Sequence, residues 1–121
     1  MLNVSAGLPN RYPRDIDVDP RDSRIVYVAE SGPRTKRVKR LAAMDQDGAN
    51  HRFLTSGQSL VLMPRFSPAS ETLSYMSFAG DQPRVWIYNL GTGRQEAVGA
   101  FDSMSFAGRF SPDGRTLVFS V

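Results

Sequence analysis

The stretch Arg65-Phe66-Ser67-Pro68 decides the fold, because the chain repeats it. The same four residues return 44 positions later as Arg109-Phe110-Ser111-Pro112, followed by Asp113-Gly114. The register then continues without a gap, so that Thr72-Leu73-Ser74-Tyr75 aligns with Thr116-Leu117-Val118-Phe119. About 40–45 residues is the length of one blade in a propeller-type repeat. The sequence therefore predicts a repeat architecture.

A third and weaker copy precedes these two. At an offset of 48, Asp19-Pro20 aligns with Ser67-Pro68, and Ile25-Val26-Tyr27 aligns with Leu73-Ser74-Tyr75. The larger offset is explained by a longer turn from Pro33 to Lys39. After that turn the offset returns to 44. The repeat thus extends over nearly the whole chain.

One complete unit contains four apolar, partly β-branched segments, near 61–66, 72–78, 84–90 and 95–99. The turns between such segments contain Asp47-Gly48 and Gly91-Thr92-Gly93, which suit the positive φ of tight hairpins. No stretch has a helical period of useful length. The predicted fold is all-β: a partial β-propeller of about two and a half four-stranded antiparallel blades. The expected organisation is a weakly structured segment 1–13, and then repeat units at 14–55, 59–99 and 103–121.

The composition is typical of a globular chain. The 121 residues include 40% hydrophobic and 22% charged residues, with a net charge of +3, which argues against disorder. Because cysteine is absent, the sequence excludes disulfides and thiolate sites. The start, Met1-Leu2-Asn3-Val4, lacks the pattern of a signal peptide, and no window is apolar enough to span a membrane. We expect a chain that is not membrane-embedded.

The run from Arg24 to Asn50 closely resembles the beginning of the propeller in the TolB family, the periplasmic component of the Tol–Pal system of Gram-negative bacteria. Leu62 to Pro68 and Phe106 to Gly114 continue the match in the same order, so the resemblance covers about residues 22–121. It extends over part of the family's propeller and does not include the amino-terminal domain.

The resemblance implies a non-enzymatic, periplasmic protein-binding module whose partner is the lipoprotein Pal. In this family the loops that enter the innermost strands face Pal. The matching positions are the partner-binding candidates Ser59, Leu60, Val61, Ser103, Met104, Ser105, Phe106 and Ala107. In the alternative interpretation, Met104 and Phe106 pack between blades. Open blade edges also allow self-association, since an unpaired strand edge is a template for pairing.

Five cations within seven residues form the most basic segment of the chain: Arg34, Lys36, Arg37, Lys39 and Arg40. Basic clusters can bind phosphates, as in nucleic-acid readers. We favour an exposed hairpin tip with solvated charges, and expect no nucleic-acid partner.

The acidic residues Asp15, Asp17, Asp19 and Asp22 have the side chains of calcium ligands. A strand, however, would splay Asp15, Asp17 and Asp19 along one solvent face, away from a common centre. His51, the only histidine, is expected to face solvent from a strand. Trp86 and Tyr88 share one strand face and are expected to pack between blades. We therefore expect no catalytic, cofactor-binding or metal-binding residue, and no cofactor. The alternative is an accessory domain or fragment of a peptidase- or lyase-type enzyme.

Overall fold

The computed structural model describes residues 14–80, 82–99 and 104–121, and the side chains of residues 14, 106 and 107 fall outside this description. The described part consists of ten strands and contains no helix. The strands are β1 (Arg14–Val18), β2 (Ile25–Ser31), β3 (Val38–Met44), β4 (Arg52–Phe53), β5 (Val61–Phe66), β6 (Thr72–Ser77), β7 (Arg84–Asn89), β8 (Gln95–Ala97), β9 (Phe106–Phe110) and β10 (Leu117–Ser120). The weakly structured segment expected at 1–13 lies outside the described residues.

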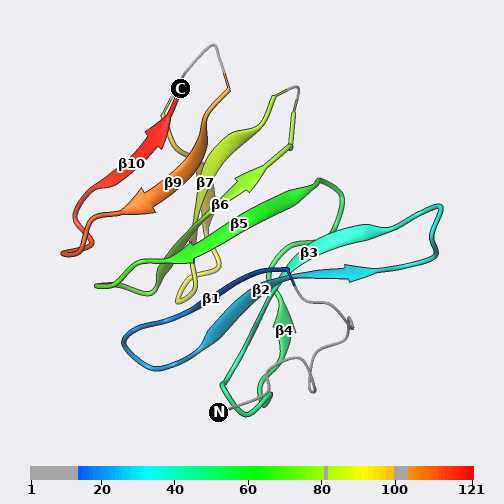
Figure 1. The fold of residues 1–121 in the computed structure, drawn as a ribbon, viewed down its shortest axis with the longest axis horizontal. Helices are drawn as coiled ribbons and strands as arrows, with labels where there is room; N and C mark the ends of the chain where they lie inside the picture. The colour runs from blue at the N-terminus through cyan, green and yellow to red at the C-terminus, as the bar shows by residue number, and fades with distance from the viewer. Residues whose placement is uncertain (1–13, 81, 100–103) are drawn as a thin grey trace.

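The strands form three sheets, ordered β1-β2-β3-β4, β5-β6-β7-β8 and β10-β9 (Figure 1). Every pairing is between neighbours in sequence and is antiparallel. This is the arrangement of successive propeller blades, each a meander of up to four strands. The predicted all-β partial propeller is confirmed.

The β2–β3 hairpin shows why a blade of this kind needs neighbours. Its pairing extends from Ile25 opposite Met44 to Ser31 opposite Val38. Five consecutive residues of β2, Ile25 to Ala29, are buried. Because successive side chains in a strand point to opposite faces, such a run shows that both faces of the sheet are covered. The turn is shorter than expected, because β3 begins at Val38, before Lys39.

The main core lies between the first two sheets. Side chains from β2 and β3 pack against side chains from β5, β6 and the turn after β7: Val26, Val28, Leu41 and Ala43 on one side, and Val61, Phe66, Leu73, Tyr75 and Leu90 on the other. Trp86 and Tyr88 pack against this cluster. Their expected position between blades is confirmed, and apolar burial between sheets provides the main driving force for stacking.

The first strand of each of the two larger sheets carries a β-bulge at the same place in the repeat. The register shifts between Arg14 and Asp17 in β1 and between Leu62 and Arg65 in β5. Within these bulges, Asp15 has a φ of 49° and Met63 a φ of 56°. Positive φ is uncommon outside glycine. The repeat therefore reproduces a backbone irregularity as well as the strands.

Candidate partner-binding rim

The functional candidates lie at one end of the sheets. β1, β5 and β9 run side by side in the same direction (Figure 1), with contacts from β1 to β5 and from β5 to β9. The segments that enter β5 and β9 thus lie at one end, and antiparallel pairing brings the β2–β3 and β6–β7 turns to the same end. We call this end the rim.

Large apolar side chains are exposed at the rim, among them Leu60 at 40%, Phe78 at 37% and Met104 at 48%. Leu60 and Phe78 adjoin, because the Phe78 N–H donates to the Leu60 carbonyl oxygen over 3.0 Å. Met104, which the alternative interpretation packs between blades, has an exposed side chain. Phe78 was not among the rim candidates expected from sequence. Its position directly after a strand and before Gly80 was the available signal.

The other candidates have different positions. Val61 is buried in the core. Ser105 is fully buried, and its Oγ accepts a hydrogen bond from the Val85 N–H over 2.9 Å while its own N–H donates to the Pro83 carbonyl oxygen over 3.0 Å. Val61 and Ser105 therefore pack beneath the rim and are not part of its exposed surface. Ser59 is half-buried. Ser103 and the side chains of Phe106 and Ala107 lie outside the described residues.

The β2–β3 turn brings positive charge to the rim. Arg34, Lys36 and Arg37 are exposed, as the sequence predicted for a hairpin tip. Arg37 also pairs with Glu30, with 3.8 Å between Nη1 and Oε2. Lys39 and Arg40 were expected at the solvated tip but are half-buried in β3. The Arg40 guanidinium lies 3.6 Å from the centre of the Phe53 ring, a cation–π contact. The rim thus combines exposed apolar side chains with a solvated cationic turn.

A groove of about 380 Å³ lies between the segment after β4 and strands β6, β7 and β8. We call it the rim groove, and its lining residues are Leu54, Thr55, Ser56, Gly57, Gln58, Ser59, Val61, Tyr75, Ser77, Ala79, Trp86 and Gln95. Two predicted candidates, Ser59 and Val61, are among them. Gln95 was not singled out from sequence, because an isolated glutamine carries no pattern.

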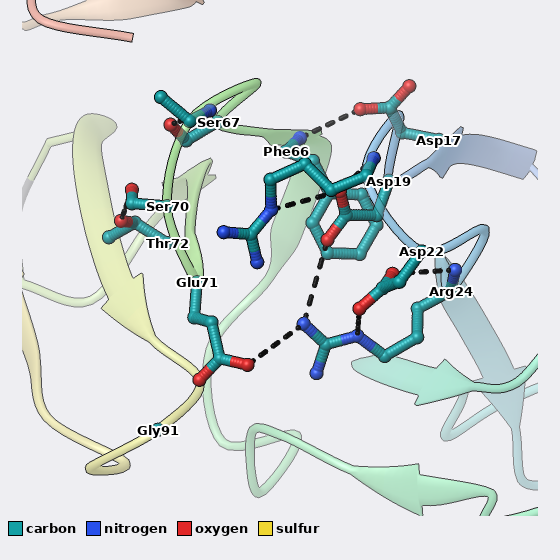
Figure 2. A network of polar contacts seen from close by, with 12 residues as sticks. Asp17, Asp19, Asp22, Arg24, Phe66, Ser67, Ser70, Glu71, Thr72 and Gly91 are labelled. Carbon is teal, nitrogen blue, oxygen red and sulfur yellow. Dashed lines mark hydrogen bonds and ion pairs between the residues drawn. The ribbon is translucent and has the colours of Figure 1, made fainter.

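The opposite end of the sheets contains a network of charged groups that joins the first two blades (Figure 2). Arg24 Nε lies 2.8 Å from Asp22 Oδ2, and Arg24 Nη2 lies 3.4 Å from Glu71 Oε1 in the next blade. Arg24 Nη2 is also 3.6 Å from Oδ2 of Asp19, whose side chain is fully buried. Burial pushes the pKa of Asp22 upward, but hydrogen bonds to Arg24 and its charge outweigh burial and hold that pKa below its usual value.

The expectation for the acidic strand was wrong. Asp15 and Asp17 do not line a solvent face: Asp15 Oδ2 accepts a hydrogen bond from the Met63 N–H over 3.2 Å, and Asp17 Oδ2 accepts one from the Phe66 N–H over 2.7 Å. The exposed residues of β1 are the apolar Ile16 and Val18. Because β5 pairs only with β6, N–H groups on its other edge need acceptors, and these carboxylates supply them.

The expectation for His51 was also wrong. His51 is half-buried and precedes β4. Its Nε2 forms a hydrogen bond of 2.7 Å with the hydroxyl of Tyr27, and its ring packs edge-on against Phe53. Burial raises the pKa of Tyr27 to about 12, so its hydroxyl stays protonated at neutral pH. His51 therefore provides the hydrogen-bond partner of the buried Tyr27 hydroxyl.

Within 14–80, 82–99 and 104–121, no group of three or more His, Asp or Glu side chains could hold a metal ion. In those ranges there is also no helix with the length and apolar character needed to cross a membrane.

Comparisons with known proteins agree on the type of domain. The model of a family described as the TolB beta propeller domain matches residues 21–121. The Tol-Pal system protein TolB of Gluconobacter oxydans (strain 621H) is 50% identical over 100 residues, which are 83% of this chain and 22% of that protein. A crystal structure of Pyrococcus horikoshii acylaminoacyl peptidase matches with a TM-score of 0.64 over 88% of this chain and 16% of its own, at 19% identity. At that identity the likeness concerns the fold alone. The chain spans about a fifth of the length of the TolB relative.

Proposed function

Because the chain belongs to the TolB beta propeller domain family, we propose that it is a non-enzymatic protein-binding module of a Tol–Pal system in the periplasm. Its partner in this proposal is a Pal-like lipoprotein. The observation that carries the proposal is the rim, where Leu60, Phe78 and Met104 are exposed beside a cationic turn. We also propose that residues 14–55, 59–99 and 103–121 are the repeat units.

The rim has the composition of a docking surface. Large apolar side chains act as anchors in protein interfaces, because a few buried anchors carry most of the binding energy. Cationic side chains around them steer partners of opposite charge. Arg34 and Lys36 take part in no ion pair within the described residues. The partner surface expected here is therefore apolar at its centre and acidic at its margin.

The proposal of a non-enzymatic role rests on the structural hydrogen bonds that the potentially reactive side chains already make. His51 contacts Tyr27, and the acidic side chains of β1 accept backbone hydrogen bonds. An assay for peptidase or lyase turnover distinguishes this proposal from an accessory or fragment of an enzyme. Turnover by the purified chain would contradict the non-enzymatic role.

The rim is tested by calorimetric titration with the soluble domain of the Pal lipoprotein of Gluconobacter oxydans. Leu60→Ser and Met104→Ser should each weaken binding by about 1–2 kcal/mol, roughly 5–30-fold. The matched control is Val118→Ser, because Val118 is 64% exposed but lies within β10, away from the rim. Equal losses in all three variants, or no binding by the unsubstituted chain, would reject the rim as the docking surface.

We propose self-association as a second kind of contact. β10 pairs with β9, and no second described strand pairs with it. An edge of this kind can add a strand from another copy. Light scattering behind a sizing column tests this directly: a discrete oligomer is expected, and a monomer at all concentrations would exclude it.

A further inference from the structure

The rim groove has the size of a small-molecule site. Its volume of about 380 Å³ lies within the range of roughly 300–1,000 Å³ usual for such sites. Its walls come from two blades: the segment 54–59 belongs to the connection after β4, and the opposite wall belongs to β6, β7 and β8. Stacking of the blades therefore forms the groove, and neither blade contains it alone.

Two aromatic rings line one wall. Tyr75 and Trp86 are paired across β6 and β7, and their rings stack with centroids 6.5 Å apart at an interplanar angle of 28°. Tyr75 is buried, whereas Trp86 is half-buried and lines the groove. The face of an aromatic ring is electron-rich and attracts weakly positive C–H groups. This wall suits the apolar face of a ring that also carries polar substituents.

The polar groups of the groove are mainly hydrogen-bond donors. The Tyr75 hydroxyl donates to Gln95 Oε1 over 2.6 Å, which leaves the two N–H bonds of that amide for another acceptor. Thr55 Oγ1 and Ser77 Oγ accept backbone N–H groups from Leu41 and Ala79, over 3.0 and 3.1 Å. Their own O–H bonds remain available to donate. A ligand with several uncharged oxygen acceptors matches this set.

The groove contains no formal charge. None of its lining residues is Asp, Glu, Lys, Arg or His. Burial, with the nearby Tyr88, raises the pKa of Tyr75 to about 12, so the phenol also stays neutral. A phosphate or carboxylate would lose its hydration without gaining a cationic partner, which is costly.

We propose that the rim groove binds a neutral, polyhydroxylated ring, such as one sugar unit of a glycan, stacked on Trp86 and hydrogen-bonded to Gln95. The groove adjoins the rim, because the partner-binding candidates Ser59 and Val61 line it, but the exposed anchors Leu60, Phe78 and Met104 do not. The two proposals can therefore fail independently.

The experiment uses Trp86 as its reporter, because it is the only tryptophan of the chain. The full chain is titrated with glucose, N-acetylglucosamine, cellobiose and chitobiose while tryptophan emission is recorded. A saturable change in emission is expected with at least one of these sugars. Glucose 6-phosphate and inorganic phosphate should give none, since the groove has no cation.

Two variants identify the groove as the site. Gln95→Ala removes the amide donors and should weaken sugar binding by about three- to tenfold, the usual effect of one neutral hydrogen bond. Gln46→Ala deletes the same side chain in an exposed turn outside the groove and should leave binding unchanged. Thermal melts of both variants show whether each is folded. If Gln95→Ala is unfolded, the titration is repeated with Ser77→Ala, which removes a hydroxyl donor of the groove and for which the same weakening is expected.

Three outcomes would overturn the proposal. The first is the absence of any saturable response up to the solubility limit of every sugar. The second is equal weakening by the groove variant and by Gln46→Ala. The third is a response to neutral peptides without one to sugars, which would assign the groove to a protein ligand.

Discussion

Replacing Arg24 by Met should destabilise the fold, because it removes the cation that faces a buried carboxylate of the same blade. The Asp19 side chain is fully buried, and its Oδ2 accepts no hydrogen bond within the described residues. Arg24 Nη2, 3.6 Å away, is the cation that faces this oxygen. The substitution keeps the aliphatic part of the side chain and removes the charge. It therefore leaves a buried carboxylate oxygen without a cationic partner.

The expected loss follows from burial. Breaking a fully buried ion pair costs about 3–5 kcal/mol. Here the cost is smaller, because the Arg24 side chain is 24% exposed and Arg21 still faces Oδ1, with its backbone N–H donating over 2.9 Å. We expect the free energy of unfolding to fall by about 2 kcal/mol, a decrease of roughly 5–10 °C in the melting temperature.

Chemical denaturation followed by tryptophan emission measures this loss. Glu71→Gln is the matched control, because Glu71 pairs with the same guanidinium over 3.4 Å but is 54% exposed. An exposed pair of this kind contributes less than about 1 kcal/mol. If Arg24→Met costs no more than Glu71→Gln, the buried carboxylate does not depend on Arg24, and the reasoning is refuted.

Three further changes test other contacts. Asp17→Ala leaves the Phe66 N–H without its acceptor, which should lower the free energy of unfolding by about 1–3 kcal/mol and speed hydrogen exchange at that amide. Asp17→Asn should cost less. Unchanged hydrogen exchange at Phe66 would contradict the contact. The pKa of Asp22 is lowered in the folded state, so the stabilisation that its carboxylate contributes is present above its unfolded pKa and is lost as the pH falls through the folded value. The difference in unfolding free energy between the unsubstituted chain and Asp22→Asn should therefore vanish in acid. A difference that stays constant with pH would contradict this prediction. Gly32→Ala should destabilise the chain more than Gly48→Ala, for which we expect a loss of roughly 1 kcal/mol. Both glycines have positive φ, but only at Gly32 would a Cβ lie 2.6 Å from the Lys36 carbonyl oxygen. Equal melting temperatures of the two variants would refute this.

Sequence reasoning succeeded where the signal is local. The strands expected near 61–66, 72–78 and 84–90 match β5, β6 and β7 within one residue. Alternation of apolar residues and glycine-containing turns depends on backbone geometry over a few residues, and these patterns are readable without a neighbour. The exposed positions of Arg34, Lys36 and Arg37 at the hairpin tip were predicted correctly for the same reason, whereas Lys39 and Arg40 are half-buried in β3.

The candidate rim was predictable only in part. The resemblance to the TolB family identified Leu60 and Met104 as candidates, and both are exposed. Val61 and Ser105, from the same segments, are buried instead. Adjacent residues of an extended chain point to opposite sides, so a contiguous stretch always contributes to both the surface and the interior.

The sequence by itself determined the repeat, its period, its strands and the family to which the chain belongs. Only the tertiary structure decided which face of each strand meets a neighbouring blade. Asp15 and Asp17 face the next blade, whereas Ile16 and Val18 are exposed. The usual rule that polar residues face water assumes a sheet with one covered face. In stacked blades, the contacts between sheets set the environment of each residue, and those contacts join positions about 48 residues apart.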